Sequence, residues 1–268
     1  MRFGVAVPMA ADPLPLAQMA EELGFDTVYV SDHVVPPVSA ARYGRNLESL
    51  TVLAAIAAVT STVRVGSSVI VVPLREPVLF AKQIATIDLL SGGRLVLGVG
   101  AGWVEGEFTN VGLDFRTRGA RTDEAIRLLR HLFSGSQEPF RGRFTTLEDF
   151  VFAPLPPQGA RLPILVGGHS PAAIRRAATM ADRYQPTFVP PEEFARLRTA
   201  VIAEARGRPI EFGCRIAIRP EQTMDEVIEA VRAYEAEGVE EMTLGLMPGT
   251  ASGERLREIG ERVIPAFA

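Results

Sequence analysis

The segment RVGSSVIVVPLREP, residues 64–77, has the composition of a buried strand that is interrupted in the middle. Its valines and Ile70 are β-branched residues, which favour strands covered on both faces, as in a parallel sheet. Two serines, Ser67 and Ser68, break this apolar run, and Pro73 follows it. We expect this interruption to lie at the carboxyl end of the strand, where a barrel strand can reach a ligand. The alternative is a regular strand whose two serines face a small void.

The rest of the chain repeats a short apolar run followed by an amphipathic segment, and such βα units predict a parallel sheet. Predicted strands cover residues 2–7, 27–30, 63–72, 95–99, 164–166, 183–188, 211–218 and 242–246. Predicted helices cover residues 14–23, 47–59, 78–90, 118–133, 171–181, 192–206, 223–237 and 253–264. Eight units predict a single domain, residues 1–268, folded as an α/β (β/α)8 TIM barrel. A doubly wound parallel sheet is the alternative.

The composition argues against several classes of protein. Hydrophobic residues make up 47% of the chain, enough for a large core. No apolar run reaches the roughly 18 residues of a membrane span, and the first residues are typical of a strand rather than a signal peptide. We therefore expect a cytoplasmic protein without a membrane partner. A net charge of −4 with interspersed acids and bases predicts no nucleic-acid partner. The only cysteine, Cys214, excludes an internal disulfide and a cysteine-cluster metal site.

One connection is longer than the repeat requires. Residues 134–163 contain turn residues, aromatic residues and prolines, which are typical of an inserted hairpin and loop. We place this insertion after the fourth strand, at the face where barrel sites form, and interpret it as a candidate lid. Together with the loops after strands six to eight, it is where we expect substrate specificity to be decided. Four aromatic residues would form either an apolar substrate pocket or the core of the lid: Trp103, Phe108, Phe140 and Phe144.

A carboxylate and an imidazole stand side by side where the second predicted strand ends, at Asp32 and His33. In a barrel, function belongs at the carboxyl ends of the strands. Histidine exchanges a proton near neutral pH, so His33 is a candidate acid or base and Asp32 a candidate hydrogen-bond acceptor. The alternative is that Asp32 caps a turn and His33 is a rim residue. His131 lies inside a predicted helix and is interpreted as scaffold.

The segment GVGAGWVEGEF, residues 98–108, follows the fourth strand. Its glycines, Gly100 and Gly102 among them, would let the backbone approach a flat ligand, with Trp103 as a wall. Two glutamates of this segment are candidates to reach that ligand: Glu105 and Glu107.

The fifth strand ends in Gly167 and Gly168, and His169 follows them. Ser170 and Pro171 then begin a helix, as N-cap and first helical residue. Because the exposed amides of such a helix start bind anions, this segment predicts a phosphate site, with plain helix capping as the alternative.

The sequence contains no zinc or calcium constellation and no G-x-S-x-G nucleophile elbow, so no metal ligands are expected. A phosphate site and a proton-transfer pair without a nucleophile indicate that a bound cofactor carries the chemistry.

Three segments together resemble the luciferase-like flavin-dependent oxidoreductases, and in particular their branch that uses the deazaflavin coenzyme F420. They are MAEELGFDTVYVSDHVV (residues 19–35), LAAIAAVTSTVRVGSSVIVVPLREPVLFAKQIATIDLLSGGRLVLGVGAGW (53–103) and LPILVGGHSPAAIRRAATMADRY (162–184). The likeness runs in order from residue 1 to about residue 184, and beyond that it depends on the continuing βα rhythm.

The resemblance implies a barrel that holds a flavin or deazaflavin over the carboxyl ends of its strands. It implies a bulge in the third strand with a non-prolyl cis peptide at Ser68–Val69, which backs the central ring. It places Asp32 and His33 near the ring, with the imidazole as a proton donor or ligand-positioning group. It also matches residues 167–170 to the segment that holds the cofactor phosphate.

Two departures from the family pattern affect the site. Relatives often have Gly-Trp where this chain has Arg183 and Tyr184. A glutamate that some deazaflavin members use in catalysis maps near Trp103, which nominates Glu105 as the catalytic carboxylate.

The leading hypothesis is an F420-dependent oxidoreductase that transfers a hydride between deazaflavin C5 and a small organic substrate. The first alternative is an FMN-dependent monooxygenase that uses O2 and reduced flavin supplied by a separate reductase. The second is a non-catalytic flavin-binding protein on the same barrel. The branch resemblance favours F420, and the family implies a homodimer. Neither motif nor spacing identifies the substrate.

Overall fold

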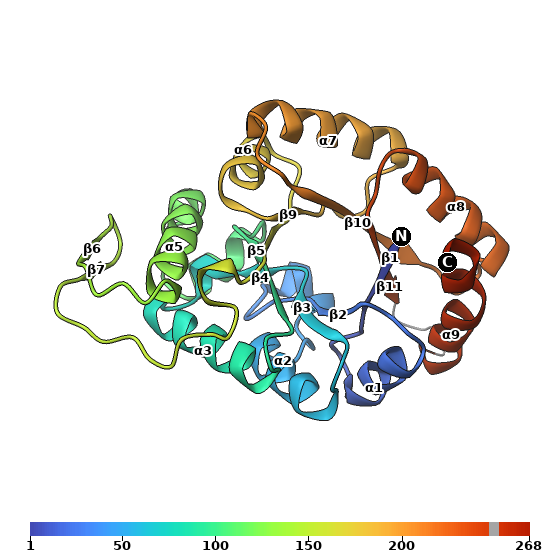
Figure 1. Ribbon diagram of the computed structural model, residues 1–268, viewed down its shortest axis with the longest axis horizontal. Helices are drawn as coiled ribbons and strands as arrows, with labels where there is room; N and C mark the ends of the chain where they lie inside the picture. Colours follow the sequence, from blue (N-terminus) through green and yellow to red (C-terminus); the bar gives the residue numbers. More distant parts are fainter. Residues whose placement is uncertain (247–251) are drawn as a thin grey trace.

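Parallel strands form a closed barrel in the part of the chain that the structure describes (Figure 1). The structure is a computed structural model and describes residues 1–246 and 252–268. The barrel strands are β1 Arg2–Ala6, β2 Thr27–Val30, β3 Arg64–Ser67, β4 Ile70–Val71, β5 Leu95–Gly100, β8 Ile164–Val166, β9 Arg183–Tyr184, β10 Glu211–Ile218 and β11 Glu241–Leu246. They pair in the order β3-β2-β1-β11-β10-β9-β8-β5-β4, and pairing of β3 with β5 closes the barrel.

Helices surround this barrel and cover its outer surface (Figure 1). They are α1 Leu14–Glu22, α2 Ser49–Val59, α3 Pro77–Leu90, α4 Glu105–Asn110, α5 Arg118–Phe133, α6 Pro171–Met180, α7 Pro191–Ala205, α8 Met224–Ala236 and α9 Ser252–Glu258. The predicted (β/α)8 barrel is confirmed. The sixth strand is shorter than predicted and ends at Tyr184, because Pro186 has no N–H to continue the ladder. Beyond it, Thr187 forms only an isolated bridge to Arg215.

The predicted interruption of the third strand is present, and it divides the strand into β3 and β4. The Ser68–Val69 peptide between them is cis, as the family resemblance implies. Ser67 Oγ donates to Gly98 O and accepts from Gly98 N, both at 2.9 Å. The hydroxyl of Ser67 therefore takes the place of a main-chain partner for β5 where regular pairing is broken.

Ser68 is tied to three other parts of the barrel. Its N–H donates to Val30 O at 2.8 Å, and its hydroxyl donates to Gln185 Oε1 at 2.7 Å. Its carbonyl accepts from Arg215 Nη1 at 2.7 Å. The two serines thus face hydrogen-bonding partners rather than a void, and they fix the interrupted strand against the opposite wall of the barrel.

Tyr29, Arg183 and Glu241 form a buried polar cluster inside the barrel. The Tyr29 ring lies between Gly4 and Gly66, where any side chain would collide with it. The Tyr29 hydroxyl donates to Glu241 Oε1 at 2.5 Å, and Arg183 Nη1 donates to Glu241 Oε2 at 3.1 Å. Burial, and then the charge of Glu241, raise the pKa of Tyr29 well above its ordinary value. Tyr29 is therefore a neutral donor that supports the buried carboxylate.

Residues 134–163 contain a hairpin that lies outside the ring of helices, beside α5 (Figure 1). Its strands are β6 Phe140–Arg141 and β7 Thr146–Leu147. The Glu124 carboxylate on α5 accepts from the N–H groups of Arg143, Phe144 and Thr145 and anchors the hairpin there. Phe144 and Thr145, at the turn of the hairpin, line one small pocket with Val72, Pro73 and Arg75, which follow β4, so the interpretation of the insertion as a lid stays a prediction.

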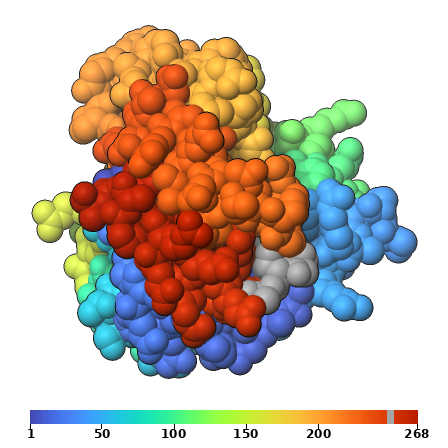
Figure 2. Space-filling view, turned by 90° about the vertical axis from the view of Figure 1, so that its right-hand side faces the viewer, coloured from blue at the N-terminus to red at the C-terminus, as the bar shows by residue number. Residues whose placement is uncertain are grey.

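The segments after β2, in blue, and after β5, in green, project at one end of the molecule in Figure 2, and part of the yellow-green insertion projects at the opposite end. The four aromatic residues of the suggested pocket pack in separate places. Trp103 packs beside His33 and Tyr43, Phe108 beside Phe115, Phe140 beside His131, and Phe144 beside Arg121. Residues 247–251, which follow β11, lie outside the described residues.

The turn between α2 and β3 is held by one carboxylate, and this predicts a pH-dependent contribution to stability. Glu21 Oε1 accepts from the N–H groups of Ser61, Thr62 and Val63 and from the Thr62 hydroxyl. Partial burial alone would raise the pKa of Glu21, but these hydrogen bonds outweigh it and lower the pKa from 4.5 to about 2. The stabilisation is therefore present above pH 4.5 and is lost as the pH falls toward 2.

We expect Glu21→Gln to lower the free energy of unfolding at pH 7 by about 1 kcal/mol, a value already reduced for solvent screening. Urea unfolding between pH 7 and pH 2.5 should show the difference from the unmodified protein shrinking below about pH 4.5. Glu22→Gln, at the exposed neighbouring position, is the control. A difference that does not depend on pH would contradict this account of the turn.

None of the described helices combines the length and apolar character that a membrane span requires.

Candidate functional site

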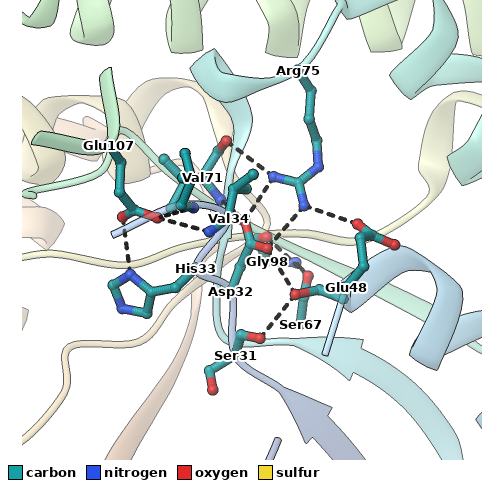
Figure 3. A network of polar contacts seen from close by, with 12 residues as sticks. Ser31, Asp32, His33, Val34, Glu48, Ser67, Val71, Arg75, Gly98 and Glu107 are labelled. Carbon is teal, nitrogen blue, oxygen red and sulfur yellow. Dashed lines mark hydrogen bonds and ion pairs between the residues drawn. The ribbon is translucent and has the colours of Figure 1, made fainter. Parts of the chain in front are cut away.

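The end of β2 sends its two polar side chains in different directions, His33 toward Glu107 and Asp32 toward Arg75 (Figure 3). Asp32 Oδ1 accepts from Ser49 Oγ at 2.7 Å and from Arg75 Nη2 at 2.8 Å. Asp32 Oδ2 accepts from Val71 N at 2.8 Å and from Arg75 Nη1 at 2.7 Å. Four bonds fill the acceptor capacity of a carboxylate, so the expectation that Asp32 binds the cofactor directly is corrected. Asp32 positions β4 instead.

The Arg75 guanidinium completes this support of the interrupted strand. It also donates to Glu48 Oε1 at 3.1 Å, and Glu48 begins α2 as its N-cap by accepting from Thr51 N. Burial would lower the pKa of Arg75, but its contacts with Asp32 and Glu48 outweigh burial and raise the pKa above the ordinary value. Arg75 is thus a permanent cation that joins the ends of β2 and β4 to the start of α2.

His33 forms a buried pair with Glu107, which lies on α4 after β5. His33 Nδ1 lies 2.9 Å from Glu107 Oε2, and Glu107 is only 2% exposed. Glu107 Oε1 accepts from Val34 N at 2.7 Å and from Val35 N at 3.3 Å. Because an ionised carboxylate only accepts hydrogen bonds, Nδ1 carries the proton. No hydrogen-bond partner of His33 Nε2 occurs in residues 1–246 or 252–268.

Aromatic rings pack around the imidazole at the barrel mouth. The Tyr43 ring stacks on His33 with centroids 4.1 Å apart and an angle of 18° between the planes. Trp103 meets both rings edge-on, at 6.2 Å from His33 and 5.8 Å from Tyr43. Trp103 is 63% exposed, so it is available as the wall that the sequence suggests. The rings and Glu107 together fix the orientation of the imidazole.

The glycines at the end of β5 and just after it lie against the interrupted third strand. A Cβ at Gly98 would lie 1.8 Å from Ser67 O, and one at Gly100 would lie 2.6 Å from Val69 Cγ2. Gly102 has a φ of +80°, and a Cβ there would lie 2.7 Å from Val71 Cγ1. These glycines therefore leave room for the interrupted third strand, and their approach to a ligand stays a prediction. The half-buried Val69 side chain packs beside Ala6, Tyr29, Val96 and Leu165.

The segment after β8 has the predicted helix start. Ser170 is the N-cap of α6, and its hydroxyl accepts from Ala173 N at 3.2 Å. The Gly168 carbonyl accepts from the Tyr184 hydroxyl at 2.9 Å, and His169 Nε2 accepts from Thr187 N at 3.3 Å. Within the described residues, the N–H groups of Gly168, His169 and Ser170 have no hydrogen-bond partner. The segment is therefore open to an anion at the start of a ten-residue helix.

Glu107 rather than Glu105 is the glutamate that contacts His33. Glu105 is exposed on the first turn of α4, and its nomination as the catalytic carboxylate stays a prediction. Residues two apart on a helix face different sides, and α4 turns the side that carries Glu107 toward His33. Sequence reasoning also missed Tyr43, which has no motif around it. It missed Arg215, although strict alternation along β10 could have found a cation among the inward-facing positions.

Among the described residues, no cluster of three or more His, Cys, Asp or Glu side chains could hold a metal ion. His131 lies on α5, where Nε2 contacts Glu138 O at 2.8 Å on the outer surface.

Comparison with curated proteins places the chain among oxidoreductases. A protein of Mycobacterium tuberculosis described as uncharacterized is 33% identical over 264 residues, which cover 91% of this chain and 89% of the relative. An F420-dependent glucose-6-phosphate dehydrogenase of Microbacterium testaceum is 34% identical over 175 residues, covering 64% of this chain and 51% of that protein. An FMNH2-dependent dimethylsulfone monooxygenase of Pseudomonas putida is 35% identical over 174 residues, which cover 63% of this chain and 46% of that protein.

The fold agrees with these likenesses. The crystal structure of monooxygenase RslO1 from Streptomyces bottropensis superposes with a TM-score of 0.85 at 22% identity, over 100% of both chains. The family model for luciferase-like monooxygenases matches residues 6–263. The chain therefore belongs to the luciferase-like monooxygenase family, a family of oxidoreductases.

Proposed function

We propose that the protein is an F420-dependent oxidoreductase that moves a hydride between deazaflavin C5 and a small organic substrate. The observation that carries this proposal is the His33–Glu107 pair, which holds a histidine nitrogen available at the barrel mouth. Oxidation of an alcohol or reduction of a carbonyl requires a proton to move at the substrate oxygen together with the hydride. A positioned histidine with an orienting carboxylate supplies that proton transfer.

The residues present fit a cofactor with a phosphate and a flat ring. The unpartnered amides of residues 168–170 and the start of α6 suit the phosphate. Val69 and the Ser68–Val69 peptide suit one face of the ring, since the surrounding glycines keep other side chains away. When bound, the deazaflavin supplies hydride transfer at C5. The chain supplies His33 Nε2 as the proton donor or acceptor, and Trp103 and Tyr43 cover the imidazole.

FMN is the second candidate cofactor, and its specific support is the likeness to the FMNH2-dependent dimethylsulfone monooxygenase. A monooxygenase of this kind would use O2 and reduced FMN from a separate reductase. The His33–Glu107 pair favours F420, because hydride exchange with an alcohol or carbonyl depends on proton transfer at the substrate oxygen.

Titration of the purified protein with F420 and with FMN tests this proposal. We expect F420 to bind more tightly than FMN, followed by the fluorescence of F420 or by calorimetry. A screen of alcohols and carbonyl compounds should then identify a substrate that changes the F420 absorbance. Tight binding of FMN alone would overturn the F420 proposal, and binding of neither would favour the non-catalytic alternative.

A further inference from the structure

Arg215 reaches from β10 across the barrel to the interrupted third strand. Its Nη1 donates to Ser68 O at 2.7 Å, next to the Val69 side chain at the barrel mouth. Its Nε is buried and has no hydrogen-bond partner. Its guanidinium also lies 5.8 Å from the centroid of the Phe188 ring, which is 60% exposed at the rim. Arg215 therefore occupies the floor of the site with much of its hydrogen-bonding capacity unused.

The charge of Arg215 has no counterion in the described part of the chain. Other buried arginines contact carboxylates: Arg75 with Asp32 at 2.7 Å, Arg176 with Asp123 at 2.6 Å, and Arg183 with Glu241 at 3.1 Å. Arg215 has no such ion pair among the described residues, and burial lowers its pKa to about 10. It remains charged at neutral pH. A half-buried cation without an ion pair among the described residues costs free energy, which an anionic ligand can recover.

We propose that Arg215 pairs with the negative charge of the two-electron-reduced cofactor ring and makes the site bind the reduced cofactor more tightly than the oxidised one. This inference rests on the proposed function. Addition of a hydride to the neutral ring adds one negative charge, which spreads over the pyrimidine part of a flavin or deazaflavin. A positive group beside that part is a recognised way for a protein to adjust the electronics of the ring.

The position of Arg215 favours the cofactor over an anionic substrate as its partner. Its only hydrogen bond in the described residues is to Ser68 O, within the peptide that the family resemblance places behind the ring. The opposite side of the mouth carries His33, Tyr43 and Trp103, where a substrate would meet the proton-exchanging nitrogen. Arg215 therefore belongs to the wall that the ring covers.

The test compares dissociation constants of Arg215→Met and Arg215→Lys for oxidised and chemically reduced F420, and for oxidised and reduced FMN, under anaerobic conditions. We expect Arg215→Met to weaken binding of the reduced form by about 10- to 100-fold and of the oxidised form by less than about 3-fold. The two-electron midpoint potential of the bound cofactor should then fall by about 30 mV for each tenfold change in the ratio of the two constants. Arg215→Lys keeps the charge and should retain most of the preference.

The control is Arg219→Met, since Arg219 is exposed and pairs with Glu221 at the end of the same strand. Thermal unfolding establishes that each variant is folded, and Arg215→Gln, which also removes the charge, supplies the same readout if the methionine variant is not. If Arg215→Met weakened binding of the oxidised and reduced cofactor equally, the ratio of the two dissociation constants would be unchanged and the inference would be overturned. If the unmodified protein binds only FMN, the proposed function fails while the FMN ratio still decides the role of Arg215. Binding of neither cofactor overturns both.

Discussion

Alanine in place of His33 is expected to lower kcat by about 10²- to 10⁴-fold, the usual contribution of a positioned acid or base. The affinity for the cofactor should stay within a few-fold of that of the unmodified protein, because His33 contacts Glu107, Tyr43 and Trp103 rather than the phosphate segment. Stopped-flow measurement of F420 absorbance, with the substrate found by screening, gives the rate. Fluorescence titration gives the affinity.

Glu107→Gln tests whether Glu107 only holds the His33 ring in place or also determines which ring nitrogen of His33 carries the proton. The amide oxygen can still accept from Val34 N and Val35 N, so the remaining amide nitrogen faces His33 Nδ1. A donor at that place forces Nδ1 to accept and moves the proton to Nε2, which reverses the role of the nitrogen that faces the site. We expect a smaller fall in kcat than for His33→Ala, with a changed pH profile. A merely structural role for Glu107 would leave that profile unchanged.

The matched control is His131→Ala, since His131 lies on the outer surface of α5. It should leave both kcat and cofactor affinity unchanged. If His33→Ala behaved in the same way as this control, His33 would have no part in the reaction. If His33→Ala instead abolished cofactor binding, the imidazole would hold the cofactor rather than exchange a proton.

Alanine in place of Gly98 is expected to cost about 3 kcal/mol or more in the free energy of unfolding. A Cβ at this position would lie 1.8 Å from Ser67 O and 2.8 Å from Ser67 C. These are backbone atoms, so no change of rotamer can relieve the collision. Movement of β3 away from β5 would also break both hydrogen bonds between the Ser67 hydroxyl and Gly98. Denaturant unfolding followed by circular dichroism measures the loss.

Gly253→Ala is the comparison variant, because a Cβ there meets only Met19 Cε at 3.8 Å, an ordinary contact. It lies in α9, where alanine is the better helix former, so we expect no loss or a small gain in stability. Gly98→Ala with the stability of this control would mean that β3 and β5 are not held as tightly as the structure indicates.

The sequence was sufficient for the architecture because the pattern that defines it is local and repeated. The valine-rich runs and the amphipathic segments each specify one element, and their strict alternation specifies a parallel barrel. The interruption at Ser67 and Ser68 was also predictable, since hydroxyl groups in an apolar strand demand partners. Their partners were not predictable, because Gly98, Gln185 and Arg215 come from strands or strand ends far away in the chain.

The errors concern orientation. Glu105 and Glu107 differ by two positions, and which of them faces His33 depends on how α4 packs after β5. The place of the hairpin depends on a contact that the sequence does not reveal, the binding of the N–H groups of residues 143–145 by Glu124 of α5. Asp32 and His33 are adjacent in sequence, yet the end of β2 directs one to Arg75 and the other to Glu107. Composition and spacing identify such residues but contain little information about these directions.

Ser68 has a consequence for how this chain can change during evolution. Its N–H, hydroxyl and carbonyl are bonded to Val30, Gln185 and Arg215, so one residue joins β2, the end of β9 and β10 across the barrel. Replacement of the Ser68 or the Gln185 side chain would leave the other side chain without its buried partner, whereas Arg215 contacts the main-chain carbonyl, which any residue at position 68 provides. Substitutions at Ser68 and Gln185 should therefore be accepted together, and these two positions should covary among related sequences.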